Sequence, residues 1–113
     1  MSDYIKLRPL PGTYSIRAAG AVLGESNAVI ALSEGNLDPV LYVPRADVGM
    51  EFFDKTDATS SCSHKGEATY FTLQAKSGPM NNAAWSFEHP LAGLETIAGH
   101  LAFRDETVTV EEI

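Results

Sequence analysis

The sequence predicts a mainly β fold: a small single domain over residues 1–113, built as a curled antiparallel sheet or a partly open barrel with one or two short helical turns. Short runs of β-like composition recur along the chain, each bounded by Gly, Pro, Asn, Asp or Ser. A length of 113 residues fits one hydrophobic core. The composition, 44% hydrophobic and 20% charged, is that of a globular protein. An α+β arrangement is the alternative.

The first half of the chain contains three predicted strands. In Thr13–Ala18, apolar and polar side chains alternate, which is typical of a strand with one face in the core. Ala28–Ser33 is largely apolar and predicts a buried strand. Pro39–Val43 is the third, and its leading proline costs no hydrogen bond of the sheet. Residues 1–9 are expected to form a loosely held N-terminal segment.

The middle of the chain combines a helical turn with the clearest strand. Ala46–Asp54 predicts the turn, with Asp47 as its N-cap. Gly66–Ala75 carries bulky side chains on both faces and predicts a central strand, and Ala83–Phe87 predicts the next one. The last expected elements are a short helix or loop over Leu91–Ala98 and a closing hairpin of His100–Arg104 with Thr107–Glu111.

The charge of the chain argues against a nucleic-acid partner. Eight Lys and Arg residues against fifteen Asp and Glu residues give a net charge of −7, and the basic residues are dispersed along the sequence. Phosphate backbones are bound by clustered cations, whereas this field would repel a polyanion. We therefore expect no nucleic-acid partner.

We expect neither a membrane-spanning segment nor an intrachain disulfide. No apolar run approaches the roughly 20 residues that cross a bilayer. Met1–Pro9 contains Asp, Lys and Arg in place of the apolar core of a signal peptide. We expect a cytoplasmic protein with no membrane partner. The single Cys excludes an intrachain disulfide and a zinc site with several thiolates.

Polar chemistry is concentrated in Thr59–Tyr70, which holds the only Cys together with a His and a Lys. If this stretch is extended, Cys62 and His64 point to the same side, because side chains alternate along a strand. A neighbouring His or Lys can favour the thiolate, so Cys62 is a candidate nucleophile and Lys65 a candidate catalytic partner. A core position is the favoured interpretation of Cys62, because Cys is among the most often buried residue types.

Other chemical motifs are weak or missing. Zinc would use Cys62, His64, His89 and His100, but their spacing matches no close ligand pair beyond the first two. We therefore expect neither a metal nor another cofactor. The sequence has no G-x-S-x-G elbow, no Walker A motif and no G-x-G-x-x-G loop.

Aromatic residues form a second candidate feature. Five of them can line a pocket or fill the core of a small barrel, and the core is favoured because large aromatics dominate packing in small domains: Tyr42, Tyr70, Trp85, Phe87 and Phe103. Tyr and Trp need partners for their O–H and N–H groups, which leaves room for a polar edge to such a pocket.

The order of these motifs resembles the bacterial family called domain of unknown function 427, which is sometimes labelled nucleotidyltransferase-like. The resemblance extends from about Ile16 to Val110. It rests on Glu34, Tyr42-Val43-Pro44 with Asp47-Val48, Cys62 with Lys65-Gly66 and Tyr70, Ala84-Trp85-Ser86-Phe87 with Pro90, and Ala102-Phe103.

The resemblance implies a mainly β domain of unestablished activity. The family pattern Cys-Pro-Tyr-Lys-Gly is replaced here by Cys62-Ser63-His64-Lys65-Gly66. Loss of the proline frees φ at Ser63 and restores an N–H donor. No phosphate loop or paired metal-binding carboxylates support the nucleotidyltransferase label.

Three functions follow from these residues. The first is a small-ligand binding domain, whose pocket is edged by Glu34, Tyr42, Asp47, Lys65, Tyr70 and Trp85, with Lys65 as anion contact. The second is an enzyme in which Cys62 is the nucleophile, His64 or Lys65 activates it, and Glu34 or Asp47 orients the basic partner. The third is a scaffold that forms a homodimer through sheet edges.

Overall fold

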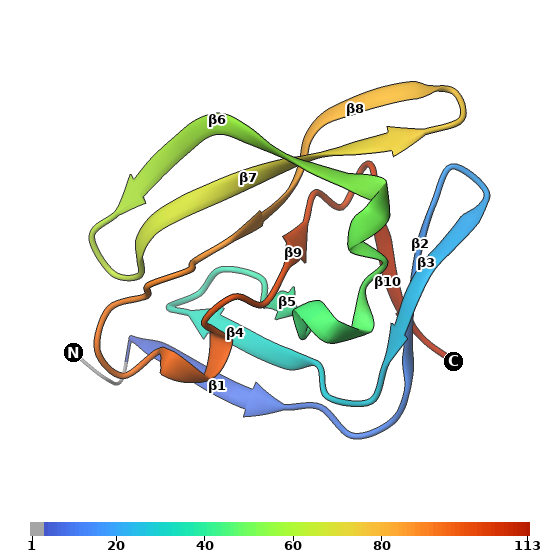
Figure 1. Cartoon of the computed structure of the whole chain (residues 1–113). Helices are drawn as coiled ribbons and strands as arrows, with labels where there is room; N and C mark the ends of the chain where they lie inside the picture. Colours follow the sequence, from blue (N-terminus) through green and yellow to red (C-terminus); the bar gives the residue numbers. More distant parts are fainter. Residues whose placement is uncertain (1–3) are drawn as a thin grey trace.

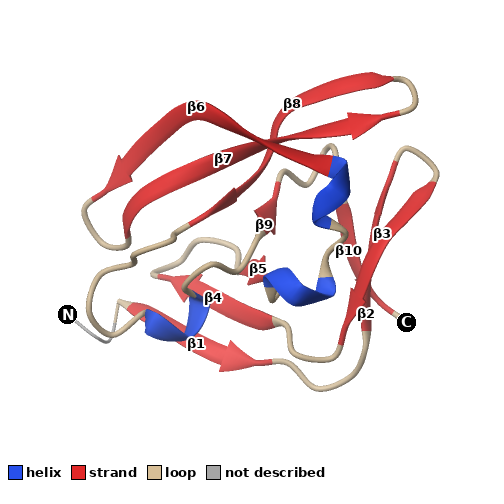
Figure 2. Cartoon of the chain, in the orientation of Figure 1, coloured by secondary structure: helices blue, strands red, loops and turns tan. Residues whose placement is uncertain are grey.

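The computed structural model describes residues 4–113, and the fold is mainly β, as the sequence predicts. Its strands form three antiparallel sheets (Figures 1 and 2), and no closed barrel is present among these residues. The strands are β1 (Ile5–Pro9), β2 (Tyr14–Ala18), β3 (Ala21–Ser26), β4 (Ile30–Glu34), β5 (Val40–Tyr42), β6 (Phe53–Cys62), β7 (Gly66–Ala75), β8 (Gly78–Ser86), β9 (Ala102–Phe103) and β10 (Thr109–Glu112). Three single 3₁₀ turns complete the described part: η1 (Arg45–Asp47), η2 (Met50–Phe52) and η3 (Glu95–Ile97).

The first sheet has the order β1-β4-β5 and carries the centre of one hydrophobic cluster. Strand β4 is its middle strand, with Leu7 of β1 opposite Leu32 and Val40 of β5 on the other side of Leu32. Leu32 is only 1% exposed. This burial explains the near-continuous apolar run that the sequence shows in β4.

The second and third sheets are β10-β2-β3 and β6-β7-β8-β9. The third contains two long twisted hairpins, which form the upper layer in Figure 1. Register shifts interrupt both of its hairpins, one between Lys55 and Thr59 and one between Phe71 and Leu73. Such bulges increase twist, so the long strands curl over the rest of the domain.

Two isolated bridges link the sheets to each other and to the 3₁₀ turns. Val43, just after β5, pairs with Leu101, just before β9, through two backbone hydrogen bonds of 2.8 Å. Gly24 of β3 pairs with Val48, which follows η1. The edges of the sheets therefore meet in the middle of the molecule without one continuous ladder.

The core consists of two clusters of buried side chains. The larger lies between the second and third sheets and includes Ile16, Phe53, Phe71 and Leu101. The smaller lies between the first and third sheets; its buried members are Ile30, Leu32, Tyr42, Ala68, Phe87, Leu94, Ile97 and Ala102. Cys62, Tyr70 and Trp85 are partly buried and pack against this second cluster.

Several elements differ from the sequence-based expectations. Ile5–Pro9 is not loosely held, because it pairs with β4 along its whole length; the first three residues of that expected segment lie outside the described part of the chain. Ala46–Asp54 contains two 3₁₀ turns, and Asp47 makes no capping hydrogen bond there. Strand β6 was not predicted, because its side chains are mostly polar and exposed.

The expected closing hairpin is wrong. Strand β9 pairs with β8, whereas β10 pairs with β2 in another sheet. The N–H groups of Thr107 and Val108 both donate to the carbonyl of Arg104, so the intervening loop closes on itself and sends the chain to a different neighbour. Periodicity shows that a segment is extended, but it does not show which strand it pairs with.

No helix in residues 4–113 is long and apolar enough to cross a membrane.

Candidate functional site

The end of β4 and the turn between β6 and β7 bring three charged or titratable side chains together. The ammonium of Lys65 donates to Oε1 of Glu34 at 2.6 Å, and Nδ1 of His64 lies 3.3 Å from Oε2 of the same carboxylate. The Glu34 and Lys65 side chains are 16% and 14% exposed, whereas that of His64 is 51% exposed. One carboxylate thus holds both side chains of the turn.

The electrostatics of this group follow from its geometry. The hydrogen bond from Lys65 lowers the pKa of Glu34 below its ordinary value; burial opposes the shift, and His64 adds to it. Burial alone would lower the pKa of Lys65, but the hydrogen bond to Glu34 and the nearby Cys62 raise it. The pair is therefore ionised at neutral pH. The Lys65 ammonium is engaged by Glu34, and the Lys65 side chain is only 14% exposed.

The turn that carries Cys62 is tight and pinned by a second loop. The N–H of Lys65 donates to the carbonyl of Cys62 at 3.2 Å, and Cys62 pairs with Gly66 at the end of the hairpin. Gly66 has φ of +113°, where other residues are strained, and the carbonyl of Lys65 accepts the N–H of Leu91 at 2.9 Å. Residues 62–64 are consequently not one extended strand. The expectation that Cys62 and His64 point to the same side required an extended stretch, so it is wrong.

Tyr42 connects this charged group to Trp85. Its side chain is almost fully buried at 1% exposure. Burial raises the pKa of the Tyr42 phenol, while the nearby Trp85 N–H and the charge of Lys65 oppose the shift. Cys62 and Glu34 also act on this phenol and raise its pKa. The structure therefore brings together five of the seven candidate residues: Glu34, Tyr42, Cys62, Lys65 and Trp85.

The other two candidate residues lie differently. The ring of Tyr70 packs against the second core cluster, but its hydroxyl points outward and lies 2.9 Å from Oγ of Ser60. Asp47 is not part of the group. Its carboxylate accepts a hydrogen bond of 2.7 Å from Ser26, and it lines a separate shallow hollow beside β3.

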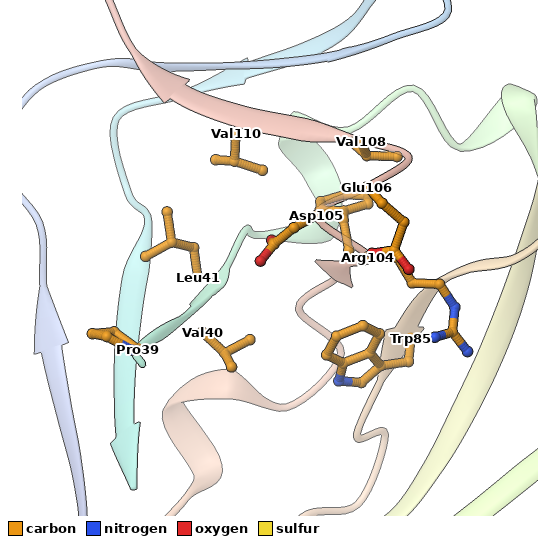
Figure 3. Close-up of a pocket in the computed structure, with 10 residues that line it drawn as sticks. Pro39, Val40, Leu41, Trp85, Arg104, Asp105, Glu106, Val108 and Val110 are labelled. Carbon is orange, nitrogen blue, oxygen red and sulfur yellow. The ribbon is translucent and has the colours of Figure 1, made fainter. Parts of the chain in front are cut away.

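A cavity of about 400 Å³ lies beside Trp85 (Figure 3). Its walls come from the three sheets: the start of β5, strands β8 and β9 with the loop after β9, and β10. Its lining residues are Pro39, Val40, Leu41, Trp85, Phe103, Arg104, Asp105, Glu106, Val108 and Val110. Trp85 is the one candidate residue in this lining. Phe103, named among the aromatic residues that can line a pocket, is also in this lining; sequence reasoning missed the other lining residues because they come from separate segments of the chain.

A second hollow, of about 370 Å³, lies on the other side of the charged turn. His64 and Ser63 line it together with Tyr4 and Leu91. The ring of Tyr4 meets that of His64 edge-on, with 4.9 Å between ring centroids. The charged group therefore lies next to this hollow, which takes in the exposed imidazole of His64.

Sequence reasoning also missed a polar cluster around Arg45. The Arg45 guanidinium contacts Glu88, donates to Ser86 Oγ at 3.2 Å and to the carbonyl of Gly99 at 3.1 Å, and lies over the ring of Phe71. Ser86 is completely buried and also donates to Glu88. Ser86 stands in a motif block, and Arg45 and Glu88 adjoin two of the blocks, but only the fold shows that these residues touch. Because Ser86 follows Trp85, the cluster holds the strand that carries the indole.

The described residues contain no group of three or more His, Cys, Asp or Glu side chains arranged to hold a metal ion. Histidines 64 and 100 lie in different surroundings. His64 pairs with Glu34, whereas Nδ1 of His100 lies 3.4 Å from the carbonyl of Ala98.

Two comparisons bear on this arrangement. The model of a family described as "Domain of unknown function (DUF427)" matches residues 6–113, nearly the whole chain. A search of curated proteins finds no match.

Proposed function

Because the chain belongs to the family of domain of unknown function 427, whose description names no activity, we propose from its own geometry that it is a small-ligand binding domain. The binding site is the cavity beside Trp85. The observation that carries this proposal is a preformed cavity of about 400 Å³, whose lining combines a tryptophan and aliphatic side chains with one charged segment. Small-molecule sites are typically concave, apolar and about 300–1,000 Å³ in volume.

Support for the indole on two sides favours binding over simple core packing. Tyr42 belongs to the buried cluster against which Trp85 packs. Ser86, the next residue of β8, is held by Arg45. A wall that is fixed before the ligand arrives costs less entropy on binding.

The charged group of Glu34 and Lys65 has a supporting role in this proposal. Its ammonium is engaged by Glu34, so Lys65 does not act as the anion contact. The pair instead fastens the β6–β7 turn to the end of β4, near Tyr42 of the cluster against which Trp85 packs.

A screen of organic acids, amines, nucleosides and sugars by thermal shift and by Trp85 fluorescence tests the proposal. A ligand of the cavity should raise Tm by mass action and change the fluorescence. Val110→Gln, on the cavity wall, should weaken binding about 5-fold or more by adding a polar group to an apolar contact. Val22→Gln is the matched control, because Val22 is 60% exposed on β3 and does not line the cavity.

Two results would remove the proposal. One is the absence of any stabilising compound in a broad screen. The other is a hit whose affinity falls equally in the Val110 and Val22 variants, because binding would then occur elsewhere.

A thiol enzyme is the second candidate, favoured by one observation. Cys62 lies near Lys65 and Tyr42, and Glu34 orients Lys65, as the sequence hypothesis requires of the basic partner. A cation beside a cysteine promotes its reactivity. The half-buried thiol of Cys62 packs against the second core cluster.

Alkylation with iodoacetamide separates this enzyme from a packed core thiol. An activated Cys62 should react faster in the folded protein than in the urea-unfolded chain, and Lys65→Met should abolish that advantage. Folding of the variant is verified by circular dichroism. A folded-state rate below the unfolded rate would exclude the nucleophile.

A further inference from the structure

The cavity beside Trp85 is divided by polarity. Most of its lining is aliphatic or aromatic and comes from β5, β8, β9 and β10, whereas its charges all come from one short segment, Arg104-Asp105-Glu106. A ligand in this cavity therefore meets apolar side chains from several strands and charged side chains from this one segment. Such a division suits an amphipathic molecule with one polar end.

The acidic members of the segment have no side-chain partner in the described part of the chain. Figure 3 shows the Asp105 carboxylate directed into the cavity, toward Leu41. Among residues 4–113, neither Asp105 nor Glu106 forms an ion pair or a side-chain hydrogen bond. Both residues are exposed. These carboxylates remain available to a charged group of a ligand.

Arg104 does not neutralise them. Its Nε donates to the carbonyl of Asn82 at 2.7 Å, and its guanidinium lies on the Trp85 side of the cavity (Figure 3). The cavity thus has a cation near its indole and the Asp105 carboxylate nearer Leu41. This polarity fixes the direction in which a charged ligand lies.

We propose that the cavity takes an amphipathic amine: an apolar or aromatic body against Trp85 and Val40, with a protonated amino group at Asp105. The inference rests on the proposed function, since it assigns a ligand class to the same site. The ammonium donates its hydrogen bonds to a carboxylate, the stronger type of hydrogen bond. An organic acid in the same position would face two like charges, and the net charge of −7 would slow its approach.

The test uses three compounds that differ only at one end: 4-phenylbutylamine, 4-phenylbutanol and 4-phenylbutyrate. Trp85 is the only tryptophan, so its fluorescence reports on this cavity alone. Isothermal titration calorimetry runs in parallel, in case a bound compound leaves the fluorescence unchanged. At neutral pH and low salt, the amine should bind about 3- to 10-fold more tightly than the alcohol, and the carboxylate more weakly than both.

Two variants separate a local contact from the overall charge. Asp105→Asn should bring the affinity for the amine down to that for the alcohol and leave the alcohol unaffected. Asp57→Asn removes the same charge from an exposed position on β6, outside the cavity, and should preserve most of the preference. Both positions are exposed, so neither substitution should prevent folding.

The outcomes distinguish this inference from the proposed function. If none of the three compounds binds by either method and the broad screen also yields no ligand of the cavity, the proposed function fails with the inference. If the compounds bind with equal affinity, or the carboxylate binds best, the amine preference is overturned while the binding site stands. If Asp57→Asn reduces the preference as much as Asp105→Asn, the selectivity arises from the net negative charge of the whole molecule, and Asp105 is not the contact.

Discussion

At the residue scale, Glu34 is the side chain on which the charged turn depends. It bonds Lys65 through one carboxylate oxygen and faces His64 with the other. Glu34 and Lys65 are both largely buried, so neither can be rehydrated freely if its partner is lost. Removing one member of such a pair usually costs more than the pair itself contributes, because a charge stays buried without compensation.

We therefore predict strong coupling between these two positions. Glu34→Gln and Lys65→Met should each lower the free energy of unfolding by about 1–3 kcal/mol. The double variant should lose less than the sum, with a coupling of about 1–2 kcal/mol. Urea unfolding of the four proteins at pH 7 measures this cycle, and strictly additive losses would contradict it.

At the scale of elements, β3 approaches η1 so closely at Gly24 that no side chain fits at this position. A Cβ atom at Gly24 would lie 2.2 Å from the carbonyl oxygen of Asp47, which belongs to the backbone. The bridge between Gly24 and Val48 requires this approach, and the adjoining Ser26–Asp47 hydrogen bond depends on the same alignment. Glycine is thus required here for space, since its φ is not positive.

Gly24→Ala should therefore destabilise the protein by about 2 kcal/mol or more, because the backbone of η1 must move. Gly20→Ala is the matched control: its φ is +78°, but no atom lies within 4 Å of the added Cβ. That control should lose about 1 kcal/mol through backbone strain alone. Thermal and urea unfolding compare the two, and a Gly24 variant no less stable than the control would contradict the close contact.

At the scale of the whole molecule, His100, Glu88 and Glu34 have pKa values below their ordinary ones. Burial lowers the pKa of His100 below its ordinary 6.5, against the opposing effects of the Ala98 carbonyl and Asp47. Glu88 also has a lowered pKa: burial would raise it, but hydrogen bonds from Ser86 and Arg45 outweigh burial. Glu34 shifts the same way. In each case the unfolded chain binds more protons than the folded one, so stability rises with pH.

The protein should therefore lose stability on acidification in two windows. The first begins as pH falls through about 6.5, because His100 must stay neutral in the fold and is protonated in the unfolded chain. The second begins below about 4.5, where Glu34 and Glu88 become protonated in the unfolded chain. Unfolding free energies measured from pH 8 to pH 3 test this profile. His100→Gln should remove the first window alone; a profile that stays flat between pH 7 and 5 would contradict the assignment.

Most of the strands could be predicted from local pattern. Gly66–Ala75 is a strand with the predicted bounds. Thr13–Ala18 exceeds β2 by one residue at its start, and Pro39–Val43 exceeds β5 by one residue at each end. These segments have apolar residues at the positions that face the core, and the spacing of those residues is visible in the sequence. Strand β6 escaped prediction because a polar strand has no such pattern.

The candidate site was only partly predictable for the same reason. Cys62, Lys65 and Trp85 stand out because Cys and Trp occur once each and because Lys65 adjoins the only Cys. The cavity lining does not stand out, since Val40, Leu41 and Val110 read as ordinary strand residues. Asp47 stood in a motif block, yet its carboxylate accepts a hydrogen bond from Ser26. This bond lies beside the bridge between Gly24 of β3 and Val48 after η1.

The sequence by itself determined that this chain is one mainly β domain of the family of domain of unknown function 427, with a short chemical segment before its central strand. The alternation of apolar and polar residues, the turn residues and the motif order are local properties, so they can be recognised without knowledge of the fold. Only the tertiary structure decided that Glu34 meets Lys65 across 31 positions, that β9 and β10 enter different sheets, and that three sheet edges enclose a cavity beside Trp85. Pairing between distant segments depends on the packing of the whole chain, which no local pattern encodes.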